Sequence, residues 1–86
     1  MSQSIYAIKD KAIGFYQVFM ASNDYGAQRY CNDLTTQENT FYNKHAKDLD
    51  LYKLSELDTD TGNTNKDLKF ICNLEIFKEK AEKPIQ

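Results

Sequence analysis

The chain is poor in the residues that most often carry special chemistry. Among its 86 residues there are two Cys, one His, one Pro and no Trp. Two thiols and one imidazole fall short of the four ligands that a standard zinc site takes from one chain. The three glycines, Gly14, Gly26 and Gly62, are scattered singly, so there is no glycine-rich phosphate-binding loop. We therefore expect no metal and no cofactor.

Long apolar runs and an excess of basic charge are missing as well. No segment approaches the ~20 apolar residues of a membrane helix, and we expect no membrane partner. The first residues lack the basic and apolar stretches of a signal peptide, which predicts a cytoplasmic protein with reduced cysteines. The 13 acidic residues outnumber the 11 basic ones, giving a net charge of −2. The overall charge is therefore not that of a typical nucleic-acid-binding protein, although opposite charges can still segregate between faces.

What the chain does contain is the composition of a folded domain. It is 41% hydrophobic and 28% charged, and its 13% aromatic content comes from six Tyr and five Phe. Residues 1–86 are enough for one domain, in the size range where a hydrophobic core is only marginally stabilising. Since self-association would bury further apolar surface, we expect a homo-oligomer.

The pattern of apolar residues predicts the order β-β-α-β-β. One helix is indicated by Ala27, Tyr30, Cys31 and Leu34, which fall at the i, i+3, i+4 and i+7 positions of a single stripe. Short runs of β-favouring residues bounded by turn residues indicate the strands. We expect strands at residues 4–9, 15–20, 50–57 and 69–77, a helix at 23–36, and a charged, exposed tail at 78–86.

These elements predict a small α+β domain, in which one helix packs on one face of a mostly antiparallel sheet. One face of the last strand is apolar throughout and should meet the helix; it consists of Phe70, Cys72, Leu74 and Ile76. The other face of the sheet should retain apolar side chains that suit a partner, namely Tyr6, Ile8, Ile71 or Phe77.

Three features invite a catalytic or metal-binding interpretation. The turn with Asp58, Asp60 and Gly62 lacks the glycine and glutamate positions of a calcium loop, so it is predicted to be a solvated turn. His45 is the only histidine, and a catalytic base needs a positioned partner and a pocket that so small a chain rarely encloses. Cys31 and Cys72 lie on predicted apolar faces, as core residues do. We expect no catalytic residues and no enzyme.

Binding of single-stranded DNA is the more specific hypothesis. Such sites combine aromatic side chains that stack on bases with Lys or Arg that follow the backbone. If the first and last strands are neighbours, they present a face of this kind; the alternative is that the aromatics are core residues and the lysines only solvated. Acidic residues of the third strand would keep DNA away from it. The candidate DNA-binding residues are Lys9, Lys11, Arg29, Lys69, Tyr6 and Tyr16.

Four segments and one single residue follow one another in a recognisable order. They are Ser-Ile-Tyr-Ala-Ile-Lys-Asp-Lys-Ala at 4–12, Phe19, Ala-Gln-Arg-Tyr at 27–30, His-Ala-Lys-Asp-Leu-Asp-Leu-Tyr-Lys-Leu-Ser-Glu-Leu-Asp at 45–58, and Thr61-Gly62. In this order they resemble the small nonstructural protein of gokushovirus-type microviruses, which are phages with single-stranded circular DNA. The chain departs from that family's pattern at four positions, with Ala46, Lys47, Leu49 and Leu57 in place of proline, glutamate, an aromatic residue and phenylalanine.

The resemblance implies a nonstructural phage protein of the host bacterial cytoplasm. Its role would be non-enzymatic, in replication or packaging of a single-stranded DNA genome, through binding of DNA together with phage replication or packaging proteins. The net negative charge and the acidic third strand favour an alternative. In that case the chain is a protein-interaction module that scaffolds phage assembly or binds a host factor without contacting DNA.

Overall fold

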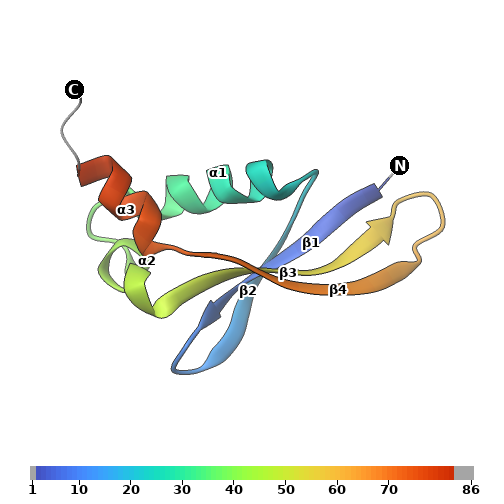
Figure 1. The fold of residues 1–86 in the computed structure, drawn as a ribbon, viewed down its shortest axis with the longest axis horizontal. Helices are drawn as coiled ribbons and strands as arrows, with labels where there is room; N and C mark the ends of the chain where they lie inside the picture. Colours follow the sequence, from blue (N-terminus) through green and yellow to red (C-terminus); the bar gives the residue numbers. More distant parts are fainter. Residues whose placement is uncertain (1, 83–86) are drawn as a thin grey trace.

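The computed structural model describes residues 2–82 and shows one antiparallel sheet accompanied by short helices. The strands lie in the order β2-β1-β3-β4, so β1 and β3 are central (Figure 1). The predicted α+β fold class is confirmed. In chain order the elements are β1 (Ser2–Asp10), β2 (Gly14–Ala21), α1 (Asp24–Thr35), α2 (Phe41–Lys44), a 3-10 turn (Ala46–Asp48), β3 (Leu49–Asp58), β4 (Thr64–Asn73) and α3 (Glu75–Glu82).

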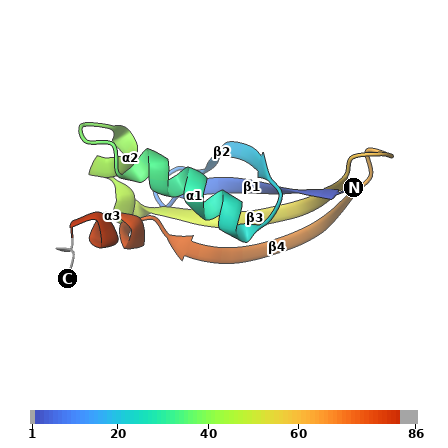
Figure 2. The ribbon, with the colours of Figure 1, turned by 90° about the horizontal axis from the view of Figure 1, so that it is seen from above.

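The helices leave one side of the sheet uncovered. Helix α1 runs along one side of the strands, while α2 and α3 gather at the end where β3 begins (Figures 1 and 2). No helix within residues 2–82 lies over the opposite side, which we call the helix-free face (Figure 1). Across those residues, no helix has both the length and the apolar character needed to cross a bilayer.

The hydrophobic core lies between α1 and the central strands. Tyr6 and Ile8 of β1 are fully buried and pack there with Ala27 and Cys31 of α1. Alternate residues of a strand point to opposite faces, so both β1 side chains belong to the helix side. The expectation that Tyr6 and Ile8 lie on the other face is therefore wrong, because β1 is a central strand placed directly beneath α1. Leu49, Leu51, Leu74 and Phe77 complete this core.

Helix α1 forms where the sequence predicts it. The side chain of Asn23 accepts a hydrogen bond of 2.8 Å from the backbone N–H of Gly26, which satisfies one of the free donors at the helix start. Ala27 and Cys31 of the predicted stripe are buried against the sheet. The amphipathic spacing and the cap therefore act together to position this helix.

The last predicted strand is wrong at its C-terminal end. Strand β4 stops at Asn73, whose side-chain oxygen accepts a 3.0 Å hydrogen bond from the N–H of Glu75 and so begins α3. The same side chain donates to the carbonyls of Lys47 and Leu49, at 3.0 and 3.1 Å, and to the carboxylate of Asp50. These contacts with the start of β3 end the sheet where the sequence pattern alone would extend it.

Three side chains of this segment do not lie where they were predicted. Phe77 and Ile76 differ because α3 replaces the end of the strand, and Phe70 differs because the pairing of β4 with β3 shifts register next to it. Phe77 lies on α3 and is only 5% exposed, because the helix turns it into the core and away from the helix-free face. Phe70 and Ile76 were expected to meet α1 but are 54% and 41% exposed. The predicted tail begins within α3, which continues to Glu82. Its remaining part, 83–86, lies outside the described residues.

We expect Phe77→Ala to destabilise the protein by about 3 kcal/mol, since it deletes a buried ring and leaves a cavity. The neighbouring Ile76→Ala, on the exposed side of the same helix, should change the free energy of unfolding by about 0.5 kcal/mol or less. Urea unfolding of both variants measures the difference. Equal losses would mean that α3 does not dock on the core as described.

Candidate functional site

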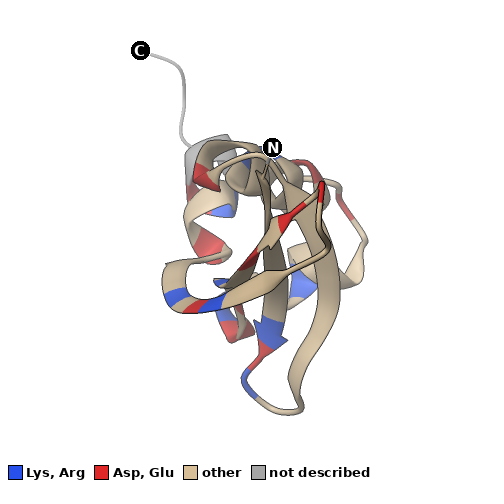
Figure 3. Ribbon diagram, turned by 90° about the vertical axis from the view of Figure 1, so that its right-hand side faces the viewer, with Lys and Arg blue, Asp and Glu red and all other residues tan. Residues whose placement is uncertain are grey.

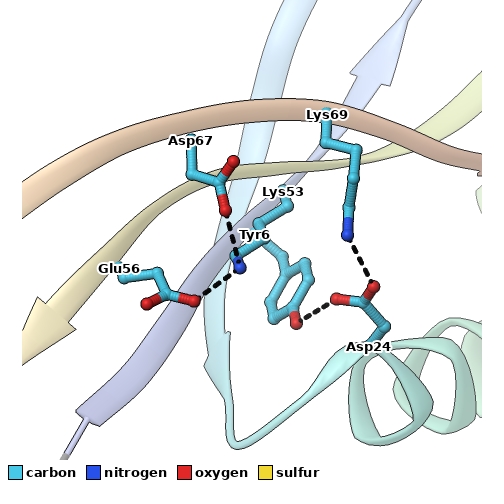
Figure 4. Close-up of polar contacts among 6 residues, drawn as sticks. All are labelled: Tyr6, Asp24, Lys53, Glu56, Asp67 and Lys69. Atoms are coloured by element: carbon cyan, nitrogen blue, oxygen red, sulfur yellow. Dashed lines mark hydrogen bonds and ion pairs between the residues drawn. The ribbon is translucent and has the colours of Figure 1, made fainter.

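Six polar side chains form two neighbouring sets of contacts beneath the start of α1, which we together call the network (Figure 4). The hydroxyl of Tyr6 donates a 2.7 Å hydrogen bond to Asp24, and Lys69 of β4 donates one of 3.0 Å to the other oxygen of the same carboxylate. On the strand side, Lys53 forms ion pairs with Glu56 at 2.6 Å and Asp67 at 2.9 Å. All of these except Asp67 line an open hollow of about 400 Å³.

Three groups of this network, Tyr6, Asp24 and Lys53, have shifted pKa values. Burial, followed by the hydrogen bond to Asp24, raises the pKa of Tyr6 to about 12. The hydrogen bonds from Tyr6 and Lys69 lower the pKa of Asp24, while those to Glu56 and Asp67 raise the pKa of Lys53. Tyr6 and Lys53 therefore keep their protons and Asp24 stays ionised. Such a set of contacts ties the helix to the sheet and is not poised for proton transfer.

Two of the predicted DNA-binding residues, Tyr6 and Lys69, belong to the network. Tyr6 is 0% exposed and its hydroxyl is bonded to Asp24, so its ring cannot stack on a base; this part of the prediction is wrong. Lys69 lies on the helix side of the sheet, where its charge is paired with Asp24. The premise behind the prediction also fails, because β1 lies between β2 and β3 and the first and last strands are not neighbours.

Three more predicted residues lie apart from one another. Tyr16 is 39% exposed, and its ring meets the edge of Phe41 of α2 at 6.0 Å between centroids. Lys11, just after β1, donates a 3.3 Å hydrogen bond to the carbonyl of Lys47. Arg29 lies on α1, with its guanidinium 5.9 Å from the ring centre of Tyr25. Together with Tyr6 and Lys69, these residues form no common surface.

Only Lys9 of the predicted set belongs to the helix-free face, where it meets a row of aromatic rings. Its Nζ atom lies 5.4 Å from the ring centre of Phe15 and 5.7 Å from that of Tyr52. The rings of Phe15 and Tyr52 are 5.2 Å apart, and Phe70 follows at 5.6 Å from Tyr52. Each of the four strands thus contributes one side chain. We call Phe15, Tyr52, Phe70 and Lys9 the aromatic row.

Two irregularities in the strand pairing align this row. Ile8 pairs with Gln17 but the next residue, Lys9, pairs with Phe15, so Tyr16 is an extra residue in β2. Strand β4 has a similar bulge. Leu51 pairs with Cys72 but the next residue, Tyr52, pairs with Phe70, so Ile71 is an extra residue in β4. Simple alternation along each strand does not show such bulges. The sequence feature that could have indicated the aromatic row is the presence of aromatic residues in three separate strands.

The helix-free face also exposes apolar side chains outside the aromatic row. Phe15 is 45% and Phe70 54% exposed, and Val18 and Met20 of β2 are 58% and 50% exposed. Val18 pairs with Ala7, which in turn pairs with Tyr52, so it shares the face of the aromatic row. Basic and acidic segments are interspersed on the side of the ribbon that Figure 3 shows. Within residues 2–82 no cluster of three or more His, Cys, Asp or Glu could hold a metal ion.

The fold and this surface define a small α+β protein with one open sheet face lined by aromatic residues. A family model described as phage ORF5 protein matches residues 3–77. The chain belongs to this family and is therefore a bacteriophage protein. The search among curated proteins gave no match, and neither did the search among solved structures.

The network makes a pH-dependent contribution to stability through Asp24. Its pKa is lower in the folded than in the unfolded chain, so the contribution is present above the unfolded value of about 3.9 and is lost as the pH falls through the folded value. The side chains of Asp24 and Lys69 are both partly exposed, which weakens their ion pair. We therefore expect Asp24→Asn to lower stability at pH 7 by only about 0.5 kcal/mol.

Denaturant unfolding of the wild type and of Asp24→Asn at pH 7 and at about pH 3 measures this effect. The gap in free energy of unfolding between the two proteins should be smaller at about pH 3 than at pH 7. The control is Asp33→Asn, an exposed acid on the same helix. A gap that is constant with pH would contradict the role given to Asp24.

Proposed function

We propose that this phage protein binds single-stranded DNA, without catalysing a reaction, on the helix-free face of its sheet. The observation that supports the proposal is the aromatic row, which sets three rings and one ammonium group side by side across all four strands. Bases stack on aromatic side chains irrespective of sequence, and lysines beside them contact the phosphates.

Single strands suit this surface better than a duplex does. In a duplex the flat faces of the bases are hidden by stacking, whereas single strands can place them against an exposed ring. Phe70 and Phe15 are each about half exposed at the two ends of the row, and Tyr52 lies between them. A strand running across the sheet would therefore meet successive rings.

The electrostatic contribution is small but favourable on this face. Lys69 and Lys53 are neutralised by carboxylates on the helix side, while Lys9 lies between two rings of the row. Asp50, which pairs with Lys9 in the ladder, is 8% exposed and accepts a 2.8 Å hydrogen bond from Asn73. We therefore propose binding that depends mainly on stacking and only weakly on salt.

The finer assignment follows the resemblance to gokushovirus nonstructural proteins. Membership of the phage ORF5 family is consistent with it. On this proposal the protein acts in the host cytoplasm, during replication or packaging of a single-stranded genome, beside phage replication or packaging proteins.

Phe70→Leu should weaken binding of a fluorescent single-stranded oligonucleotide roughly 5- to 150-fold, since one stacked base is worth about 1–3 kcal/mol. The matched control is Tyr25→Leu, which removes an aromatic residue that is 71% exposed on α1. Thermal unfolding of both variants checks that they fold. An unchanged affinity for Phe70→Leu, or an equal loss for Tyr25→Leu, would place the DNA elsewhere.

Lys9→Gln should reduce the salt dependence of the same titration. Each phosphate contacted on single-stranded DNA contributes a slope of about −0.7 to the plot of log affinity against log salt, so losing one contact should flatten the plot by about that amount. Lys44→Gln, an exposed lysine on α2, is the control. Equal slopes for the wild type and Lys9→Gln would show that Lys9 contacts no phosphate.

A protein-interaction role without DNA contact is the second candidate. The exposed apolar side chains of Val18 and Met20 favour it, since such side chains on a sheet face also suit a protein partner. Absence of oligonucleotide binding even at low salt would favour this role. Capture of one specific host or phage protein, lost in Phe70→Leu but kept in Tyr25→Leu, would then support it.

A further inference from the structure

The two edges of the sheet differ in how they meet solvent. Strand β4 carries Lys66, Asp67 and Lys69, and its pairing with β3 shifts register twice. Charges and bulges of this kind are the usual means by which proteins stop an edge strand from pairing with another chain. Strand β2, at the opposite edge, contains no charged residue and no proline.

The regular part of β2 is the segment after its bulge. From residue 17 to residue 21 the strand pairs with β1 without interruption, so its outer backbone groups form an even row. Val18 and Met20 within it are half or more exposed, although both are apolar. An uncharged, regular, apolar edge is a template for pairing with a further strand.

We propose that β2 pairs with β2 of a second copy of this chain, in antiparallel orientation about a two-fold axis beside Phe19. The two sheets then join into one of eight strands. In this register Val18 faces Met20 of the partner subunit and Gln17 faces Ala21 of the partner subunit. The contact is self-complementary, as a two-fold interface must be, and brings no charge against another.

A second copy fits this edge better than an unrelated strand because the same short segment supplies both halves of each apolar pair. Pairing also leaves the helix-free face open, because it uses the backbone edge of β2. Across the two-fold axis the two aromatic rows lie on the same side of the joined sheet. The proposed dimer therefore does not depend on DNA binding, and a dimer could still bind DNA on the helix-free face.

The dimer should be reversible. The exposed apolar side chains in the paired segment are those of Val18 and Met20, so each copy contributes few side chains to the contact. A standard interface buries ~800 Å² on each partner. We therefore expect dissociation at micromolar concentration, so mass must be measured over a range of concentrations.

Sedimentation equilibrium of the wild type without DNA, from about 1 to 300 µM, should show a rise from the 10.0 kDa monomer to twice that mass. Val18→Lys should stay monomeric throughout, because a lysine on an edge strand opposes pairing. Leu68→Lys, at a 53% exposed position of β4, should dimerise like the wild type. Circular dichroism checks the folding of each variant, and Met20→Lys replaces Val18→Lys if the latter is unfolded.

Hydrogen exchange of the wild type locates the contact independently of any variant. Backbone amides of β2 should exchange several-fold more slowly at high than at low protein concentration, while those of β4 stay unchanged. A wild type that is monomeric at 300 µM overturns the proposal. So does a dimer that persists in Val18→Lys or protects β4 in place of β2.

Discussion

One long helix has to cover a four-stranded sheet, and it can cover only one side of it. Helix α1 places Ala27 and Cys31 against Tyr6 and Ile8, and this contact fixes β1 as the strand beneath the helix. No helix of the described residues covers the opposite side, where Phe15 and Phe70 remain about half exposed. The exposed rings of the helix-free face follow from this shortage of covering elements, since a small chain has little further structure to place there.

Two lysines on the helix side of the sheet are ion-paired with carboxylates, whereas Lys9 on the helix-free face lies beside aromatic rings. Asp24, in the first turn of α1, holds both the hydroxyl of Tyr6 and the ammonium of Lys69. Lys53 is held between two further carboxylates. A chain of net charge −2 can therefore still present a cation on its open face, because the helix-side lysines are already paired there and Lys9 is left among rings.

The sequence predicted the elements whose signals are local. The cap at Asn23 and the stripe through Ala27 and Cys31 were sufficient for α1. The β-favouring runs located all four strands, although β4 begins at Thr64, five residues before its predicted start. The end of β4 was missed because Asn73 bonds to groups 23 to 26 residues earlier in the chain. Tyr6 was assigned to the wrong face, since alternation divides a strand into two faces without saying which one meets the helix.

The aromatic row was missed for a related reason. Phe15, Tyr52 and Phe70 come together through two bulges, and a one-residue shift in register exchanges the faces of every later residue. The face and the edge of the sheet nevertheless serve different contacts. A strand of DNA would use ring faces, whereas a second copy would use the backbone groups of β2. Because the two contacts use different atoms, a dimer would carry two separate aromatic rows on the same side of the joined sheet, and a DNA strand long enough to reach both rows would bind more tightly than one that reaches a single row.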